Sequence, residues 1–156
     1  MLSVLSRLAQ GRLPNPPCSR SETVFLDTSY CIALMREWAR GNEGPAVKKL
    51  RELGDTSLRI SLFVACELEA GARMSDNPNH EIRKVERFME HVDVILPDRS
   101  FAVAYGEMEA LLRGKGRPIP SMDLMIGVMA RMHGAPLLAG PDSHFKQIPG
   151  LVLEIF

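Results

Sequence analysis

The chain has 156 residues, and its 46% hydrophobic and 24% charged residues are typical of a globular domain. A chain of this length buries roughly 70% of the surface that it exposes when unfolded, so it needs no disulfide or structural metal to fold. Its 19 Lys and Arg residues balance its 19 Asp and Glu residues, which argues against nucleic-acid binding through overall charge. No apolar run is long enough to span a membrane.

The first 22 residues differ from the rest and are expected to form a flexible N-terminal extension. They contain Arg7, Arg12 and Arg20, no acid before Glu22, and a proline-rich break. A targeting or docking segment, a disordered tail and a start codon placed too far upstream all remain open. The folded domain is predicted to span residues 23–156.

The first half of this domain alternates short apolar runs with longer helical patterns. The run from Val24 to Leu26 predicts a buried strand that ends at Asp27, and Thr28 or Ser29 can cap the next helix. Pro45 suits the first turn of a second helix. The expected elements are a strand at 24–26, helices at 28–40 and 45–53, a strand at 58–61 and a helix at 62–74.

The second half continues the alternation. A stripe of apolar residues predicts a helix over 98–112, and Ser121 is expected to cap a helix that Gly134 ends. The other expected elements are a turn at 76–79, a charged helix at 81–90 and strands at 92–96, 137–138 and 151–156. This order predicts an α/β fold, a three-layer α/β/α sandwich whose central, mainly parallel sheet has about five strands.

Four acidic residues from distant segments are expected at one edge of this sheet. Asp27 follows the first strand and Asp142 follows the fourth, while Glu67 and Asp123 lie in the early turns of two helices. Open parallel sheets bind ligands at the carboxyl ends of their strands. We therefore expect the four carboxylates to converge in one pocket.

Such a cluster predicts a divalent-metal site. Close carboxylates repel one another, and Mg²⁺ relieves the repulsion because it prefers oxygen ligands. A bound dication can activate water and stabilise the leaving oxygen of a phosphodiester. The acids therefore predict hydrolysis of a nucleic acid.

Each acid also has an ordinary structural interpretation. Asp27 can cap a helix, and Asp123 can favour a helix dipole. Glu67 can be an exposed helical residue, although its apolar neighbours indicate that its charge needs a partner. Asp142 can be a turn residue. The conjunction of the four favours the functional interpretation.

Other chemistries fit the sequence less well. The three cysteines, Cys18, Cys31 and Cys66, share no metal-ligand spacing, so free thiols in a reducing cytoplasm are expected. The four histidines form no zinc motif, and no Ser-His-Asp or Cys-His set is present. A phosphatase of the haloacid dehalogenase kind needs a second Asp where Ser29 stands. A Rossmann domain needs a glycine-rich turn after the first strand.

Four stretches of the sequence together resemble a PIN domain, in particular the VapC-type ribonuclease toxins of bacterial toxin–antitoxin pairs. They occur in family order and cover most of residues 23–156: VFLDTS, SLFVACELEAG, RPIPSMDLMIGVMARMHGAPLL and PDSHFKQIPGLVL. The resemblance implies a PIN-like fold and an endoribonuclease that depends on Mg²⁺ or Mn²⁺. Asp27 and Asp123 would be its main metal ligands, and Glu67 and Asp142 would complete the site or hold waters. An RNA substrate, a cognate antitoxin and a homodimer are also implied.

The chain departs from this family in three places. The family usually has Thr or Ser at the end of the fourth strand, where this chain reads Ala139-Gly140-Pro141-Asp142. Gly127 stands where Ala is more usual, and the N-terminal extension has no counterpart. The altered loop motivates an alternative, a catalytically weak PIN-like module that binds RNA or a protein.

Basic residues beside the acids predict how a substrate is held. Arg113, Lys115 and Arg117 precede Asp123, and His144 and Lys146 follow Asp142. They are expected to bind RNA phosphates, although an ordinary solvated loop is the alternative. Few aromatic residues lie nearby in sequence, so base stacking is not expected to be the main grip.

The helix after Asp27 is more apolar than one sheet face requires. Its large apolar residues are Tyr30, Ile32, Leu34, Met35 and Trp38. In the resembling family an antitoxin segment fills a groove near such helices. The alternative is that these residues belong to the core, and an exposed remainder would favour an interface.

Overall fold

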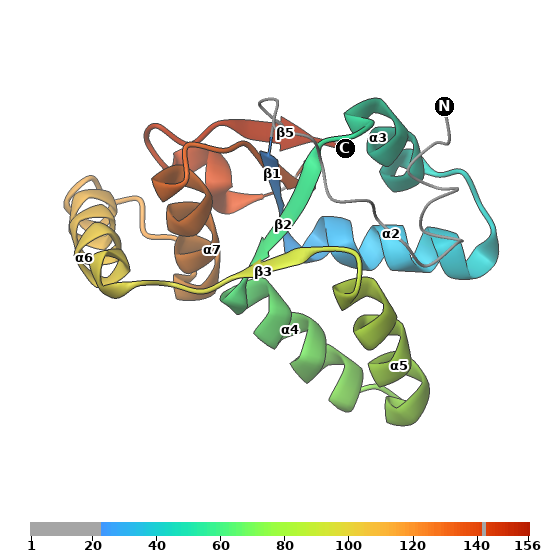
Figure 1. Cartoon of the computed structure of the whole chain (residues 1–156). Coiled ribbons are helices and arrows are strands. Elements are labelled where there is room, and N and C mark those ends of the chain that lie inside the picture. The colour runs from blue at the N-terminus through green and yellow to red at the C-terminus, as the bar shows by residue number, and fades with distance from the viewer. Residues whose placement is uncertain (1–22, 142) are drawn as a thin grey trace.

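Five parallel strands form the centre of the structure (Figure 1), a computed structural model that describes residues 23–141 and 143–156. The strands are β1 (Thr23–Leu26), β2 (Ser57–Ser61), β3 (Asp93–Ile95), β4 (Leu137–Ala139) and β5 (Leu153–Ile155). Their order in the sheet is β3-β2-β1-β4-β5, and every neighbouring pair is parallel. The predicted fold class is therefore confirmed.

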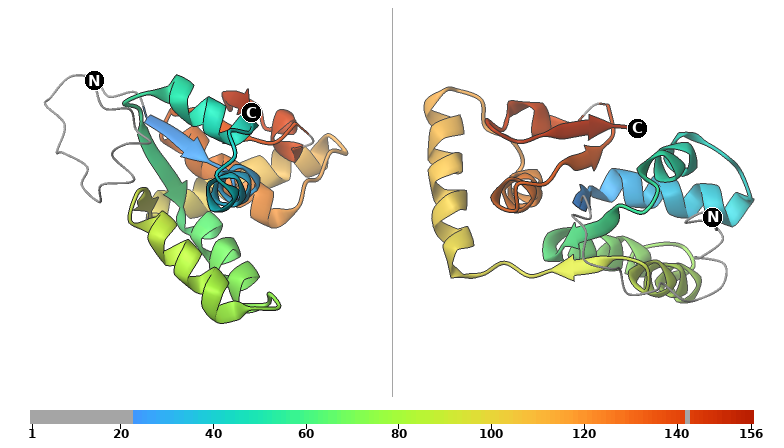
Figure 2. Two further views of the ribbon diagram at one scale, coloured as in Figure 1. Left: turned by 90° about the vertical axis from the view of Figure 1, so that its right-hand side faces the viewer. Right: turned by 45° about the horizontal axis from the view of Figure 1, so that its top comes forward.

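Helices lie on both sides of this sheet, with α6 and α7 on one side and α2, α3 and α5 on the other (Figures 1 and 2). Helices α4 and α5 form an antiparallel pair that extends below the sheet in Figure 1. The helices are α2 (Thr28–Arg40), α3 (Pro45–Leu53), α4 (Leu62–Arg73), α5 (Pro78–Met89), α6 (Arg99–Gly114) and α7 (Ser121–Met132), with a short 3₁₀ helix, η1 (His144–Gln147).

The strand order changes direction next to β1, and this positions the candidate site. The chain places β2 and then β3 to one side of β1, and afterwards places β4 on the other side. Leu26 pairs with Leu138, and the backbone N–H of Asp27 donates to the carbonyl of Leu138 at 2.9 Å. The carboxyl ends of β1 and β4 are thus neighbours at the point where open α/β sheets bind ligands.

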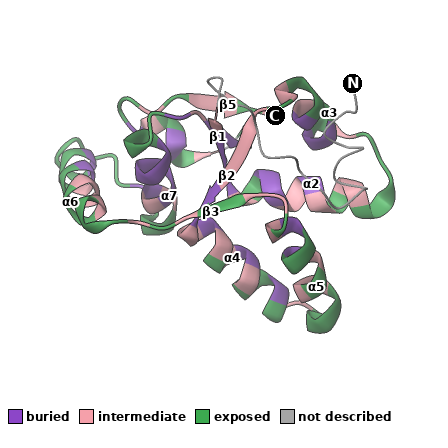
Figure 3. Cartoon of the chain, viewed as in Figure 1, coloured by how far each residue is buried: buried purple, intermediate pink, exposed green. Residues whose placement is uncertain are grey.

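The core surrounds the central strands and α7. The apolar residues of β1 and β4 are buried, as expected for a parallel sheet that helices cover on both faces. Figure 3 shows α7 largely buried and α6 mostly exposed. A Cβ on Gly127 of α7 would lie only 2.3 Å from Cδ1 of Ile148. The glycine therefore lets α7 approach the segment that carries η1.

Two element starts differ from the sequence-based expectation. Ser121 does not cap α7, because Pro120 takes the cap position and Ser121 is already the first helical residue. Helix α5 begins within the predicted turn, since the Asn77 side chain accepts the His80 N–H and Pro78 suits the first turn.

The segment 1–22, with its three arginines and Cys18, lies outside the described residues. Within the described part of the chain, no helix is long and apolar enough to cross a membrane.

Candidate active site

Asp27 and Asp123 line one pocket of about 440 Å³ at the switch point of the sheet. Asp27 directly follows β1, and Asp123 lies in the first turn of α7, beside the end of β4. The pocket is completed by Ser29, Gly140, Pro141, Ser143, His144, Phe145 and Phe156. Segments that are far apart in sequence thus bring two of the four predicted acids together.

Asp27 is both a helix cap and a wall of the pocket. Its Oδ2 accepts the Ser29 N–H at 3.1 Å and the Ser29 hydroxyl at 2.5 Å, so it caps α2. The residue is only 8% exposed. Burial raises the pKa of its carboxyl above the ordinary 3.8, bonds from Ser29 and Thr28 lower it, and the charge of Asp123 raises it further. The net shift is upward, so the ionised carboxylate is unfavourable here.

The Asp123 carboxylate contacts a histidine. Nδ1 of His144 lies 2.7 Å from Oδ2 of Asp123, and the two side chains are 52% and 28% exposed. The packing of η1 against α7 makes this contact possible. Among the residues that the structure describes, no Lys or Arg forms an ion pair with Asp27 or Asp123. The two carboxylates therefore have little fixed positive charge beside them.

Glu67 lies next to this pocket rather than in its wall. Its Oε2 accepts a short hydrogen bond from the hydroxyl of Thr28, the neighbour of Asp27, which supplies the partner expected for its charge. Because Glu67 is in the second turn of α4, its carboxylate reaches the first turn of α2 and lines a different hollow. Of the four predicted acids, Asp27 and Asp123 thus line one pocket, and Glu67 is bonded to the neighbour of Asp27. Asp142 lies outside the described residues, and its position stays a prediction.

No larger metal-ligand set is present within residues 23–141 and 143–156. No three His, Cys, Asp or Glu side chains in that part of the chain are close enough together to hold an ion. The two cysteines described are free, and burial raises the pKa of the Cys31 thiol, so it is a poor nucleophile. Two carboxylates with oxygen donors nearby still fit a hard dication, because Mg²⁺ commonly uses only one or two protein carboxylates.

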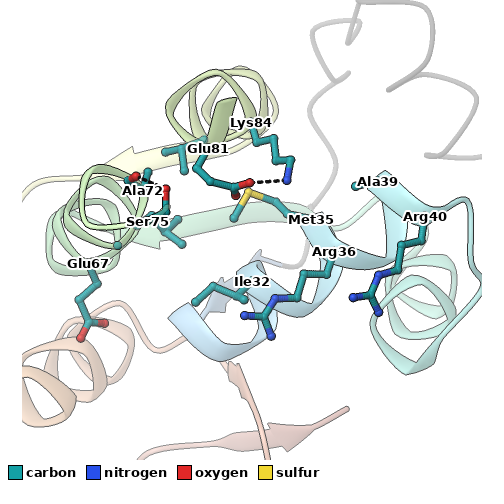
Figure 4. Close-up of a pocket in the computed structure, with 13 residues that line it drawn as sticks. Ile32, Met35, Arg36, Ala39, Arg40, Glu67, Ala72, Ser75, Glu81 and Lys84 are labelled. Atoms are coloured by element: carbon teal, nitrogen blue, oxygen red, sulfur yellow. Dashed lines mark hydrogen bonds and ion pairs between the residues drawn. The ribbon is translucent and has the colours of Figure 1, made fainter. Parts of the chain in front are cut away.

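A second hollow, of about 520 Å³, lies between α2, α4 and α5 (Figure 4). Apolar side chains from all three helices line it: Ile32, Met35, Leu68, Ala72 and Val85. Its charged residues are Arg36, Arg40, Glu67, Glu81 and Lys84, of which Glu81 and Lys84 pair at 2.6 Å. We call this hollow the α2–α4–α5 groove.

The apolar residues of α2 contribute both to the core and to the groove. Both interpretations of this surface, as core and as interface, therefore apply to part of it. Tyr30 and Leu34 are fully buried, whereas Ile32 and Met35 are partly exposed and line the groove. Trp38 is partly buried against the core. The exposed remainder that would favour an interface is therefore present.

The predicted basic rim is exposed, and part of it has partners within the chain. Arg113 pairs with Glu109 at 2.5 Å, and Nζ of Lys146 donates to the carbonyl of Pro141 at 2.8 Å. Lys115 and Arg117 lie in the exposed loop before α7. The role of these four cations in substrate binding stays a prediction.

Three pocket contacts were not expected from sequence. The sequence indicates Ser29 as a possible helix cap. In the structure its hydroxyl also donates to the Asp27 carboxylate and accepts the Gly140 N–H at 3.1 Å. A hydroxyl thus stands beside the loop that lacks the usual Thr or Ser. The His144 contact with Asp123 and the presence of Phe156 in the pocket gave no local sequence signal, because both depend on how η1 and β5 pack.

The chain is similar to known proteins over most of its length. Residues 24–151 match the family model described as PIN domain. The chain is 30% identical over 130 residues to the tRNA(fMet)-specific endonuclease VapC of Shigella flexneri, covering 83% of this chain and 95% of that protein. It is 31% identical over 127 residues to ribonuclease VapC1 of Haemophilus influenzae, covering 81% and 92%.

Solved structures give the same similarity. VapBC2 from Rickettsia felis, bound to a DNA fragment from its promoter, has a TM-score of 0.77 and 26% identity, covering 86% of this chain and 98% of that chain. DNA-bound VapBC from Salmonella typhimurium has a TM-score of 0.75 and 28% identity, with the same coverage.

The raised pKa of Asp27 gives a prediction for the metal-free protein. A carboxyl with a raised folded-state pKa stabilises the fold most below its unfolded value, near 3.8, and this stability is lost as the pH rises through the folded pKa. Asp27→Asn keeps a capping side chain without the charge. It should raise the melting temperature at pH 7 in EDTA by a few degrees, since about 1 kcal/mol corresponds to roughly 2–4 °C in a domain of this size.

Thermal melts in buffers from about pH 4.5 to about pH 8 measure this effect, because this range lies above the ordinary pKa of Asp. The gain from Asp27→Asn should shrink toward acid pH. Asp98→Asn is the matched control, because hydrogen bonds from Ser100 lower the pKa of Asp98 and reverse the expected sign. A lower melting temperature for Asp27→Asn at pH 7 would show that the ionised carboxylate is not the strained form.

Proposed function

The chain belongs to the PIN domain family, and from this premise we propose that it is a metal-dependent endoribonuclease and the toxin of a type II toxin–antitoxin pair. The observation that carries the proposal is the pocket shared by Asp27 and Asp123 at the carboxyl ends of β1 and β4. The names of the relatives, ribonuclease and endonuclease VapC, support the reaction class.

Asp27 and Asp123 would hold the divalent ion, Mg²⁺ or Mn²⁺. The raised pKa of Asp27 supplies one reason, and the lack of a Lys or Arg paired with either acid among the described residues supplies another, because a dication offsets the negative charge of the carboxylates. The chemistry that a bound ion supplies is activation of water and stabilisation of charge on the leaving oxygen. Glu67 and Asp142 would complete the site or hold waters.

The remaining residues of the pocket position these two carboxylates. Ser29 fixes Oδ2 of Asp27 through its N–H and hydroxyl, and His144 holds Oδ2 of Asp123. Thr28 holds the carboxylate of Glu67 one residue away from Asp27. Hydrolysis then needs the scissile phosphodiester to enter beside Asp27 and Asp123, with water on the opposite side of phosphorus from the leaving oxygen.

The substrate that we propose is RNA, held at its phosphates by the basic rim. The neutral overall charge means that binding depends on local cations, of which Lys115 and Arg117 are exposed at the loop before α7. Arg113, now paired with Glu109, and Lys146, now bonded to the Pro141 carbonyl, can exchange these partners for phosphate oxygens.

The partner that we propose is an antitoxin segment that lies in the α2–α4–α5 groove. The apolar floor fits one face of an amphipathic helix, and Arg36 and Arg40 extend from α2 in the same direction in Figure 4. Such a segment would carry acidic residues opposite these two arginines. The similarity to solved VapBC structures supports a protein partner, and a homodimer remains a prediction.

Removal of either pocket carboxylate tests the enzymatic activity. Asp27→Asn and Asp123→Asn should each lower the rate of RNA cleavage in Mg²⁺ or Mn²⁺ by at least about 100-fold, the scale of losing one electrostatic contact in an active site. Single-turnover cleavage of tRNA and ribosomal RNA measures the rate. Asp98→Asn, at the start of α6, should keep the wild-type rate. Equal cleavage by wild type and Asp27→Asn would instead support the non-catalytic binding module.

Filling the groove tests the antitoxin site. Ala39 is exposed and lines the groove, so Ala39→Trp adds bulk without opening the core. It should weaken neutralisation by the cognate antitoxin at least about 10-fold, the effect of losing roughly 1.4 kcal/mol of binding, while RNA cleavage by the free chain is kept. Ala110→Trp, on the exposed face of α6, is the control. Unchanged titration of Ala39→Trp by the antitoxin would move the partner to another surface.

A further inference from the structure

Phe156 forms part of the wall of the pocket that contains Asp27 and Asp123. It is brought there by β5, at the edge of the sheet next to β4. Its N–H lies 3.4 Å from the carbonyl of Ala139, which ties this end of the chain to the last residue of β4. An aromatic ring therefore stands in the candidate active site although the sequence around the acids contains few aromatic residues.

The ring of Phe156 is held in one position by its neighbours. It meets the ring of Tyr30 edge to face, with centroids 4.9 Å apart and planes at 77°. Tyr30 is itself fully buried, and its hydroxyl donates to the carbonyl of Ala46 at 2.9 Å. A fixed support thus orients the Phe156 ring, which reduces the entropy lost when a ligand packs on it.

The ring is also close to the carboxylate end of the pocket. Gly140 lies between them: a Cβ placed there would be 3.4 Å from Ser29 Oγ and 4.0 Å from Cε1 of Phe156. Ser29 Oγ in turn donates to Asp27 at 2.5 Å. Gly140 and the Ser29 hydroxyl thus lie between the Phe156 ring and the Asp27 carboxylate.

The exposure of Phe156 distinguishes it from the aromatic residues of the core. Phe25, Tyr30 and Phe145 are buried, whereas Phe156 is only partly buried and contributes surface to the pocket. The pocket volume, about 440 Å³, lies within the roughly 300–1,000 Å³ of small-ligand sites, so it can admit one nucleotide.

We propose that Phe156 is a stacking platform for a nucleobase adjacent to the phosphodiester that is cut. The proposal rests on the proposed ribonuclease function, and names a base-binding subsite for it. Single-stranded RNA presents unstacked bases that pack on aromatic rings, and every base has a face that can do so. Stacking then adds to the phosphate contacts that the sequence predicts as the main means of holding the substrate.

Paired substitutions separate stacking from a purely structural role. Phe156→Leu keeps an apolar side chain but removes the flat ring, and should raise KM about 10-fold, within the range measured for loss of one stacked base. It should change kcat much less, because the ring touches the base and not the reacting atoms. Phe156→Tyr keeps the flat ring and should therefore keep the wild-type KM. Phe101→Leu is the control, since Phe101 is also partly buried but packs on Phe63 and Tyr105 away from the pocket.

A substrate-side measurement keeps the test independent of folding defects. Single-stranded RNA oligonucleotides with one abasic nucleotide at successive positions around the cut site are compared with the intact oligonucleotide. At one position, removal of the base should raise KM for the wild type and for Phe156→Tyr. The same removal should have no further effect on the KM of Phe156→Leu. Equal KM for Phe156→Leu and wild type, or an abasic effect that persists unchanged in Phe156→Leu, would overturn the stacking platform.

Binding measured without cleavage distinguishes failure of this subsite from failure of the proposed function. Oligonucleotides carrying 2-aminopurine report stacking by fluorescence quenching in the presence of Ca²⁺. Quenching by the wild type that is lost in Phe156→Leu, without any RNA cleavage in Mg²⁺ or Mn²⁺, supports the subsite and contradicts the nuclease. Cleavage with no dependence of KM or quenching on Phe156 supports the nuclease and contradicts the subsite.

Discussion

The burial of the Asp27 carboxyl, in a pocket that also contains the Asp123 carboxylate, is the constraint on which the site depends. The strand order brings the ends of β1 and β4 together, and α7 adds Asp123 to the same pocket. Burial and the second negative charge both raise the pKa of Asp27. Since no Lys or Arg in the described part of the chain pairs with either acid, the pocket is relieved most effectively by a proton or by a hard cation. In the function that we propose, the cation supplies the activation of water for hydrolysis.

The first turn of α2 connects this pocket to the α2–α4–α5 groove. Thr28 donates to Glu67, which lines the groove, while Ser29 donates to Asp27 and accepts the Gly140 N–H. Two adjacent hydroxyl residues therefore link α4, the β4 loop and the candidate metal ligand. A partner bound in the groove, as we propose, would therefore lie next to the carboxylates, whereas a nucleotide stacked on Phe156 would occupy the pocket of Asp27 and Asp123.

Much of this fold could be predicted from the sequence, because buried parallel strands are short apolar runs and helices begin at recognisable caps. The start of α7 was placed imperfectly, since a Ser before an apolar run does not show that Pro120 takes the cap position. Asp27 and Asp123 were predictable because a strand end and a helix start fix their backbone at the ligand-binding edge. The position of Phe156 was not predictable, because tertiary packing decides which hollow an aromatic ring after an edge strand lines.

Equilibrium binding of Mn²⁺ to the metal-free protein tests the shared metal site most directly, and it needs neither RNA nor an antitoxin. Electron paramagnetic resonance of free Mn²⁺ gives the number of bound ions and their affinity in wild type, Asp27→Asn, Asp123→Asn and Asp98→Asn. We expect wild type and Asp98→Asn to bind alike, and each pocket variant to lose at least about 10-fold in affinity. Equal Mn²⁺ affinity in all four proteins would contradict a metal held between Asp27 and Asp123.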